Sequence, residues 1–506
     1  MRFYVVEEHP LRIYIESDER ELYLLMSSLQ TKFYRETEYS TDDDIRNIIF
    51  IDETSGKPYF AKGLSSIILG EASRLSIPVE STIDTSVCTY EYEDVTEDIL
   101  EGISLREYQI EGVRAALRYK FGLIQVATGG GKTEMMIAIC KYLMDRHDGH
   151  ILICVPSSKL LHQTYDRLVL RGINPDDISK YGDGNKIDTD RKVAIATVQT
   201  VHRRLDDEDF RGWYDQLVCL MMDEAHHCSA RTFYTVIDTL APEYMLGVSA
   251  EPFYGDKDHM IQDLLLRGIV GPVIHRVTVD YLVERGFLSK PYMIAVDSKY
   301  PGDIYKVIDW KVVNKSCIVN NRHRNQDIID AAVTLIAKGK NPLILVSQIK
   351  HGDYLSREIS NKGYRVAMLT GGSKVTIYMN GNDVDSYKDP EGDTQKQFQN
   401  GSIDVLIGSS VMDEGVDLPA LSSVILAGGG KSSVKLCQRV GRGLRPKSGD
   451  NTTIILDFQD RFNVVTHSHF KTRKTSIEKL GVDVYYINDT NKQLGDFVDY
   501  LCKNRP

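Results

Sequence analysis

The sequence of 506 residues lacks any long uninterrupted apolar run. A helix that crosses a membrane needs about 20 consecutive apolar residues, and no segment approaches that length. The opening stretch, MRFYVVEEHPLRIYIESDER, also lacks the apolar run and small-residue cleavage site of a secretory signal. We therefore expect no membrane association and a cytoplasmic location.

Paired cysteines and internal repeats are also missing. The eight cysteines are scattered without paired spacing, which argues against a disulfide framework and favours a reducing compartment. No period of about 20–50 residues recurs, so a solenoid is excluded. At this length the chain should instead fold into several globular domains.

Positive charge is scarce in the first hundred residues, which hold 9 Lys and Arg against 21 Asp and Glu. The rest of the chain holds 52 against 51. The net charge of the chain therefore cannot attract a polyanion such as a nucleic acid, and local basic patches would have to bind one. The acidic stretch from Glu91 to Asp98 indicates a linker that ends a small N-terminal domain.

Short runs that are apolar on both faces alternate with helical patterns from about Leu105 onward, as in covered parallel sheets. We predict an α/β fold with a small acidic N-terminal α+β domain over residues 1–98. Two consecutive α/β domains should follow over 99–290 and 291–506, the latter with a C-terminal helical extension. The expected strands are 122–127, 151–155, 193–197, 217–222, 245–249, 343–347, 365–369, 404–408, 423–427 and 453–457.

A glycine-rich loop between a predicted strand and helix is the strongest single motif. It reads Ala127-Thr-Gly-Gly-Gly-Lys-Thr133. Glycines let backbone N–H groups surround phosphate oxygens, and the following helix start favours negative charge. The pattern predicts ATP bound by Thr128, Gly129, Gly130, Gly131 and Lys132, with the Thr133 hydroxyl on Mg²⁺.

Two adjacent carboxylates, Asp223 and Glu224, end another apolar strand in Asp-Glu-Ala-His. Asp223 is expected to ligate Mg²⁺, and Glu224 to activate the attacking water. The next residues, His226-His-Cys228, cannot all reach one metal ion from regular structure, so we interpret His226 as a coupling residue.

Paired arginines occur far along the chain, in Gln438-Arg-Val-Gly-Arg-Gly-Leu-Arg445. Arg442 and Arg445 lie three residues apart, hence on one helical face, and both could address one γ-phosphate. We predict an arginine finger in cis, with Gln438 in the same catalytic element.

The ordered motifs resemble superfamily 2 helicases over residues 105–460. Leu105-Arg-Glu-Tyr-Gln109 is similar to the Q motif, and Gly247-Val-Ser-Ala-Glu-Pro252 to motif III, with Glu251 where the family has Thr. The resemblance implies two tandem RecA-like parallel-sheet domains. It also implies adenine recognition by Gln109 with Arg106 nearby, nucleotide contacts from Gly415 and Asp417 in motif V, and strand contacts from Pro156, Ser157, Thr197, Gln199 and Ser409.

Within this superfamily the likeness is to phage UvsW-type branch-migration helicases and, further off, to XPB-like proteins. Asp52–Gly63 resembles the end of their small N-terminal domain, and Asn320–Asn325 the turn that opens their second motor domain. This implies a motor acting on DNA forks, junctions and R-loops, with Lys57 and Lys62 as candidate DNA contacts. We expect a monomer that meets recombination or replication proteins, in the host cytoplasm if a phage encodes it.

Other readings of the motifs are a small-molecule kinase, a non-enzymatic sensor, the motor subunit of a restriction-type translocase, and an RNA helicase. Neither a kinase nor a sensor explains both Glu224 and the paired arginines. Two segments remain open. Ser373–Thr394 is rich in turn residues and predicts a projecting surface loop or short hairpin. Arg461–Lys479 is basic and is either a phosphate-contacting segment or a solvated helix.

Overall fold

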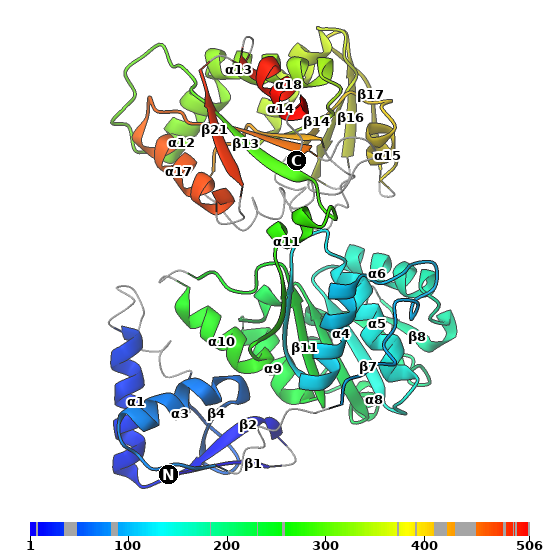
Figure 1. Cartoon of the computed structure of the whole chain (residues 1–506), viewed down its shortest axis with the longest axis vertical. Coiled ribbons are helices and arrows are strands. Elements are labelled where there is room, and N and C mark those ends of the chain that lie inside the picture. Colours follow the sequence, from blue (N-terminus) through cyan, green and yellow to red (C-terminus); the bar gives the residue numbers. More distant parts are fainter. Residues whose placement is uncertain are drawn as a thin grey trace. The chain divides into compact units, whose positions relative to one another are not determined.

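The computed structural model describes two compact units (Figure 1). One comprises Met1–Ala127 with Gly131–Val277, and the other Thr278–Pro506 with Thr128–Gly130. No helix in the described part of the chain is long and apolar enough to cross a membrane. The described residues are 1–6, 9–34, 48–81, 90–182, 184–229, 231–255, 259–371, 374–389, 392–408, 422–430, 452–478, 482–488, 490 and 493–503.

A parallel seven-stranded sheet in the order β12-β6-β11-β10-β7-β9-β8 forms the centre of the first unit. Its central strands are buried on both faces, as the apolar runs predicted. The strands are β6 (Phe121–Val126), β7 (His150–Val155), β8 (Ile178–Tyr181), β9 (Val193–Thr197), β10 (Leu217–Asp223), β11 (Tyr244–Ser249) and β12 (Val273–Val277). The helices are α4 (Glu107–Tyr119), α5 (Lys132–Met144), α6 (Ser158–Leu170), α7 (Val198–Arg203), α8 (Glu208–Tyr214), η3 (Ala225–Ser229), α9 (Arg231–Leu240) and α10 (Met260–Val270).

The N-terminal domain is α+β, as predicted, and belongs to the first unit. Its five strands lie in the order β3-β4-β2-β1-β5. The acidic stretch after it lies along α4 and α5, where Glu91 pairs with Arg118 at 2.9 Å and Asp94 with Arg146 at 2.6 Å. The elements are β1 (Arg2–Val6), β2 (His9–Glu16), α1 (Glu19–Tyr34), β3 (Phe50–Ile51), β4 (Pro58–Ala61), η1 (Lys62–Leu64), α3 (Ser65–Arg74) and β5 (Glu80–Ser81).

The N-terminal domain is docked on α9 and α10, beside which it lies in Figure 1. The Arg12 guanidinium of β2 binds Asp238 of α9 through two hydrogen bonds of 2.9 and 2.5 Å and also binds Asp52 at 2.7 Å. Leu264 of α10 joins the apolar core of the N-terminal domain, and Leu11 of β2 joins the core around the seven-stranded sheet. The two cores thus exchange side chains, and the domains form one body.

A nine-stranded sheet in the order β17-β16-β15-β18-β14-β19-β20-β13-β21 forms the second unit. All its strand pairs are parallel apart from β15–β16 and β16–β17, because β16 runs opposite to the other strands. Its strands are β13 (Lys290–Val296), β14 (Pro342–Leu345), β15 (Val366–Thr370), β16 (Lys374–Met379), β17 (Asn382–Lys388), β18 (Val405–Gly408), β19 (Ser423–Leu426), β20 (Thr452–Phe458) and β21 (Asp483–Ile487). The helices are α11 (Val279–Glu284), α12 (Trp310–Val313), η4 (Asn314–Val319), α13 (Arg322–Ala337), α14 (Ile349–Ser360), α15 (Asp393–Gln399), α17 (Val464–Glu478) and α18 (Gln493–Lys503).

The segment Ser373–Thr394, expected as a projecting loop or short hairpin, contains the hairpin of β16 and β17, and β16 is part of the sheet. Strand β16 pairs antiparallel with β15, and its Val375 and Ile377 are buried. Asn380 and Gly381 both have positive φ, as a tight two-residue hairpin turn requires. The expectation of a projecting loop is therefore wrong for β16, because one face of this strand is core.

The basic segment Arg461–Lys479 is for the most part a packed helix, α17. Arg473 is buried and binds Asp457 through hydrogen bonds of 2.8 and 2.9 Å. His469 and Phe470 are also buried, whereas Lys471 is exposed. Neither sequence interpretation anticipated this, because the pairing of Arg473 depends on the fold.

Candidate active site

The glycine-rich loop joins β6 to α5, as the sequence predicted. Gly129 has a φ of +84° and Gly131, the residue that precedes α5, a φ of +82°. Side chains rarely adopt this left-handed conformation, so the loop needs glycine at both positions. The turn places Lys132 and Thr133 in the first turn of α5, where backbone N–H groups have no partner within the helix.

Gln109 is held between the start of α4 and this loop. Its Oε1 accepts a hydrogen bond of 2.8 Å from the backbone N–H of Arg106. A Cβ added at Gly131 would lie 2.1 Å from Nε2 of Gln109, so a larger residue there would displace the Gln109 side chain. The Arg106 side chain donates to the Tyr108 hydroxyl at 3.0 Å. The residues predicted to recognise adenine are thus fixed directly beside the phosphate loop.

Asp223 and Glu224 lie at the carboxyl end of β10, within reach of Lys132. The Lys132 Nζ is 3.5 Å from Oε1 of Glu224. Glu224 has a φ of +51°, which is uncommon for a residue with a side chain and is found at strained functional positions. Its backbone N–H donates to Oδ1 of Asp223 at 3.0 Å. The strained turn therefore directs two adjacent carboxylates toward the loop lysine.

The surroundings of Asp223 suit a bound cation. Desolvation and then the charge of Glu224 raise the pKa of the Asp223 carboxyl above its ordinary value, although Lys132 opposes them. A divalent cation beside Asp223 would relieve this repulsion. Within the described residues no cluster of three His, Cys, Asp or Glu could hold a metal. The residues fit Mg²⁺, which usually binds through one or two carboxylates together with nucleotide phosphates.

His226 connects the end of β10 to the end of β11. Its Nδ1 is 3.2 Å from the hydroxyl of buried Ser249 and 3.5 Å from Oε2 of Glu224. Gly247 allows the close packing of β11 here, because an added Cβ would lie 2.9 Å from that of Ala225. Ser249 thus has a hydrogen-bond partner in His226, and the coupling role expected of this pair stays a prediction.

Of the predicted strand contacts, Ser157 follows β7 and Thr197 is the last residue of β9, so both lie at the carboxyl end of the sheet, as the glycine loop and Asp223 do. Each residue caps a helix. The Ser157 hydroxyl accepts from Leu160 N at 3.4 Å, and that of Thr197 from Thr200 N at 3.3 Å. Pro156 is half-buried, and Gln199 is exposed. Their contact with nucleic acid stays a prediction.

Lys57 and Lys62 lie in different surroundings. Lys57 is exposed and donates to the Tyr4 hydroxyl at 2.9 Å. The Lys62 ammonium lies 5.6 Å from the centre of the Phe121 ring, at the contact with the seven-stranded sheet. The predicted Ser409, Gly415, Asp417, Gln438, Arg442 and Arg445 lie outside the described residues.

Sequence reasoning missed a buried ion cluster directly behind the loop. Glu134 of α5 is buried and binds Arg167 of α6 at 2.6 Å and Arg171, the residue that follows α6, at 3.0 Å. Burial of a carboxylate is costly unless it is paired, and two arginines provide the pairing here. A glutamate two residues after Lys132 gave no signal of this role, because α6 approaches it only in the fold.

Two families match the chain, and the first match spans the glycine-rich loop and the Asp223–Glu224 pair. Residues 102–254 match the family described as type III restriction enzyme, res subunit. Residues 325–447 match the helicase conserved C-terminal domain.

Two curated relatives cover most of the chain. It is 24% identical to "ATP-dependent DNA helicase uvsW" of Enterobacteria phage T4, over 75% of this chain and 72% of the relative. It is 26% identical to "DNA 3'-5' translocase XPB2" of Sulfurisphaera tokodaii, over 69% and 80%. Among solved structures, the fragment of a putative HsdR subunit of a type I restriction enzyme from Vibrio vulnificus YJ016 shares the fold. Its TM-score is 0.56 at 18% identity, covering 76% of this chain and 69% of that one.

The two family matches and the helicase-named relatives identify the chain as an ATP-driven helicase, an enzyme that hydrolyses nucleotide to move on nucleic acid. The chain belongs to helicase superfamily 2, which confirms the resemblance drawn from its motifs.

Proposed function

We propose that the chain is an ATP-dependent DNA translocase that remodels forks, four-way junctions and R-loops by branch migration. The docked N-terminal domain carries this proposal. Because Arg12 binds Asp238 and the two cores share side chains, a DNA arm held by the N-terminal domain would stay fixed relative to the sheet edge at Ser157 and Thr197. That arrangement suits a branched substrate, in which an arm and a pulled strand are separate.

Branch migration also suits the energy that a small motor delivers. Each base pair broken is replaced by one formed, so the motor only has to bias a nearly balanced exchange. The similarity to a named DNA helicase and a named DNA translocase supports DNA as the substrate.

The residues of the loop and of β10 divide the work of hydrolysis. Lys132 would leave its 3.5 Å pair with Glu224 to bind the phosphates of ATP, which frees the carboxylate to accept a proton from the attacking water. Asp223 and the Thr133 hydroxyl would hold Mg²⁺, which neutralises phosphate charge when bound. Arg442 and Arg445 would stabilise charge that develops on the γ-phosphate.

A second candidate is the motor of a restriction-type translocase, which moves along duplex without separating strands. The family match over residues 102–254 and the structural likeness to a putative HsdR subunit favour it. The two candidates differ in whether a branch is needed.

The test compares a four-way junction, a replication fork and a tailed duplex of equal length, each with ATP and Mg²⁺. The wild-type chain should process the junction and the fork preferentially. Lys57→Glu should slow the processing of the junction and the fork about tenfold and leave single-strand-stimulated ATPase unchanged. Arg20→Glu makes the same charge change at an exposed position of α1 and should slow neither substrate. Equal rates on all three substrates would refute branch migration. Movement along unbranched duplex without strand separation would favour the second candidate, and activity confined to RNA would indicate an RNA helicase.

A further inference from the structure

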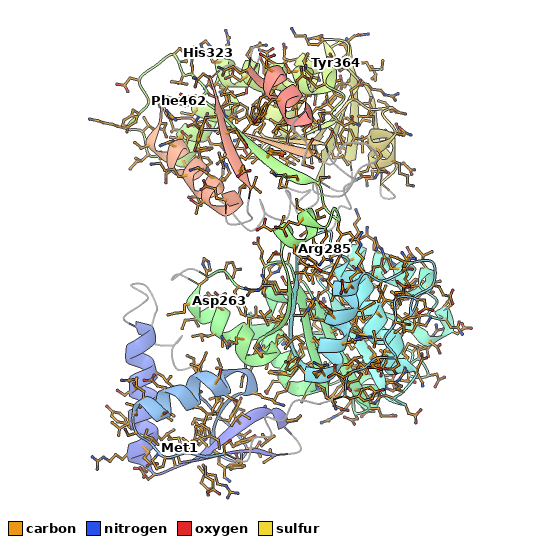
Figure 2. All side chains as sticks on the ribbon, in the orientation of Figure 1. Met1, Asp263, Arg285, His323, Tyr364 and Phe462 are labelled. Carbon is orange, nitrogen blue, oxygen red and sulfur yellow. The ribbon has the colours of Figure 1, made fainter. Side chains whose placement is uncertain are left out.

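The second unit contains a cavity of about 730 Å³, to which the turn Asn320–Asn325 contributes three lining residues. Its walls come from α12 and η4, from the first turn of α13, and from the residues that follow β14. The apolar cluster behind it includes Trp310 and Phe462, and Figure 2 labels the latter close to α12 and α17. Trp310 lines the cavity and packs against His469, with ring centres 4.7 Å apart.

The lining of this cavity is cationic in a chain whose net charge is −11. Four of its residues are Lys or Arg, and none is Asp or Glu. Among the residues that the structure describes, no ion pair is recorded for any of the four. Four amide side chains and Tyr354 complete the polar lining, together with His351. The four cations are Lys311, Lys315, Arg322 and Lys350.

The cavity lies where parallel sheets bind ligands. Strands β14 and β19 are neighbours, and the chain leaves β14 toward β15 on one side and β19 toward β20 on the other. Ligands of such sheets bind at the carboxyl ends of the strands where the connections diverge in this way. Gln348 precedes α14, the helix that comes after β14, and Lys350 lies in the first turn of α14, which no side chain caps. Its backbone N–H groups therefore add to the positive field of the lysines.

Three of the four cations, Lys311, Lys315 and Arg322, lie between the two family matches, the first of which ends at residue 254 and the second of which begins at 325, whereas Lys350 lies within the second match. Part of the cavity wall, Asn314–Val319, is a turn of π-helix, an irregularity that is often kept at functional sites. Lysines alternating with aromatic side chains are the usual composition of surfaces that bind a single nucleic-acid strand, since lysines contact phosphates and aromatic rings stack on bases.

We propose that this cavity binds a phosphodiester and an adjacent base of the DNA strand on which the chain acts. Lys311, Lys315 and Lys350 contact the phosphates, and Trp310 and Tyr354 contact the base. The choice of DNA strand rests on the proposed function, but the binding itself requires neither ATP nor a branch. The segment before α13 is thus a strand contact in addition to the motifs shared by the superfamily.

Equilibrium binding of a short single-stranded oligodeoxynucleotide to the full chain, without nucleotide, tests the proposal. Lys311→Ala/Lys315→Ala should raise Kd about tenfold and reduce the slope of log K against log salt by about 1.4, at roughly 0.7 per phosphate contact. Lys362→Ala/Lys388→Ala removes the same charge from exposed positions of this unit that do not line the cavity, and should change Kd less than about twofold. Basal ATPase should be the same in both variants.

The chain has two tryptophans, and Trp213 is fully buried in the other unit, so Trp310 can report occupancy directly. The oligonucleotide should quench tryptophan fluorescence, and Trp310→Phe should abolish the quench while the thermal melt stays as in wild type.

Three results would overturn the proposal. They are equal binding by the two double-lysine variants, a quench that survives in Trp310→Phe, and displacement of the oligonucleotide by millimolar inorganic phosphate, which would indicate a small-anion site. Strand binding through this cavity without any preference for branches would refute branch migration and leave the cavity proposal intact.

Discussion

Gly63 provides a direct test of how tightly the N-terminal domain is docked. A Cβ added there would lie 1.8 Å from the backbone oxygen of Arg267 and 2.9 Å from that of Gly268, both in α10. Close carbon–oxygen contacts lie at about 3.3 Å, so Gly63→Ala must separate η1 from α10 by about 1.5 Å. A backbone oxygen cannot rotate away as the end of a side chain can.

Such a gap forfeits a large part of the dispersion energy between Leu64, Leu264 and their neighbours. Overpacking in cores costs about 1–3 kcal/mol and occasionally more. We expect the upper end, about 3 kcal/mol, which corresponds to a fall of roughly 6–12 °C in the melting temperature of the first unit.

Gly70→Ala is the matched control, because the same methyl group is added seven residues further on. Gly70 lies within α3, and an added Cβ meets nothing within 4 Å. Alanine is the better helix former, so this variant should be stabilised by up to about 1 kcal/mol. Differential scanning calorimetry, with limited proteolysis to detect release of the N-terminal domain, measures both variants. Equal melting temperatures for the two would refute the docking described here.

Two further outcomes concern the active site and the second unit. Glu224→Gln should still bind ATP but hydrolyse it at least about 10²-fold more slowly, because an amide cannot accept the proton of water. Glu208→Gln, at an exposed position, is the control. Turnover at the wild-type rate in Glu224→Gln would show that Glu224 is not the base. Burial, and then the charge of Arg324, lower the pKa of His351 to about 3 in the folded state. Between about pH 6.5 and pH 3 this histidine is therefore protonated in the unfolded state and neutral in the folded state. The unfolding free energy should therefore fall by about 2 kcal/mol from pH 6.5 to 5, and His351→Gln, but not exposed His323→Gln, should remove that part of the slope in denaturant titrations. An unchanged slope in His351→Gln would contradict this assignment.

Buried parallel strands were the part of the fold that the sequence predicted best. The prediction of 193–197 coincides with β9, and that of 217–222 lies within one residue of β10. Such strands are apolar on both faces, so composition alone marks them. Strand β12 was missed, because its Val-Ile-His-Arg-Val sequence is half-exposed at a sheet edge and carries no such signal.

The active site was predictable where function depends on residues close together in sequence. The glycine loop and the Asp223–Glu224 pair lie where the motifs placed them. The link from His226 to Ser249 and the use of Gly63 at a domain contact depend on which elements become neighbours in space. Nothing in the sequence indicated that the ammonium of Lys62, whose contact with DNA stays a prediction, lies over the ring of Phe121. A glycine such as Gly63 indicates a close approach of another part of the protein, but the sequence does not say which part, and here it is α10.

The hairpin of β16 and β17 determines which strand edge the nine-stranded sheet exposes to solvent on that side. Strand β15 is almost entirely buried, and without the hairpin its apolar edge would be open to pairing with another chain. Strand β17 is exposed along most of its length and carries Asp383, Asp385 and Lys388. Charged edge strands resist addition of further strands. The hairpin thus protects the folded protein against aggregation, and shortening it would first be noticed as precipitation during expression.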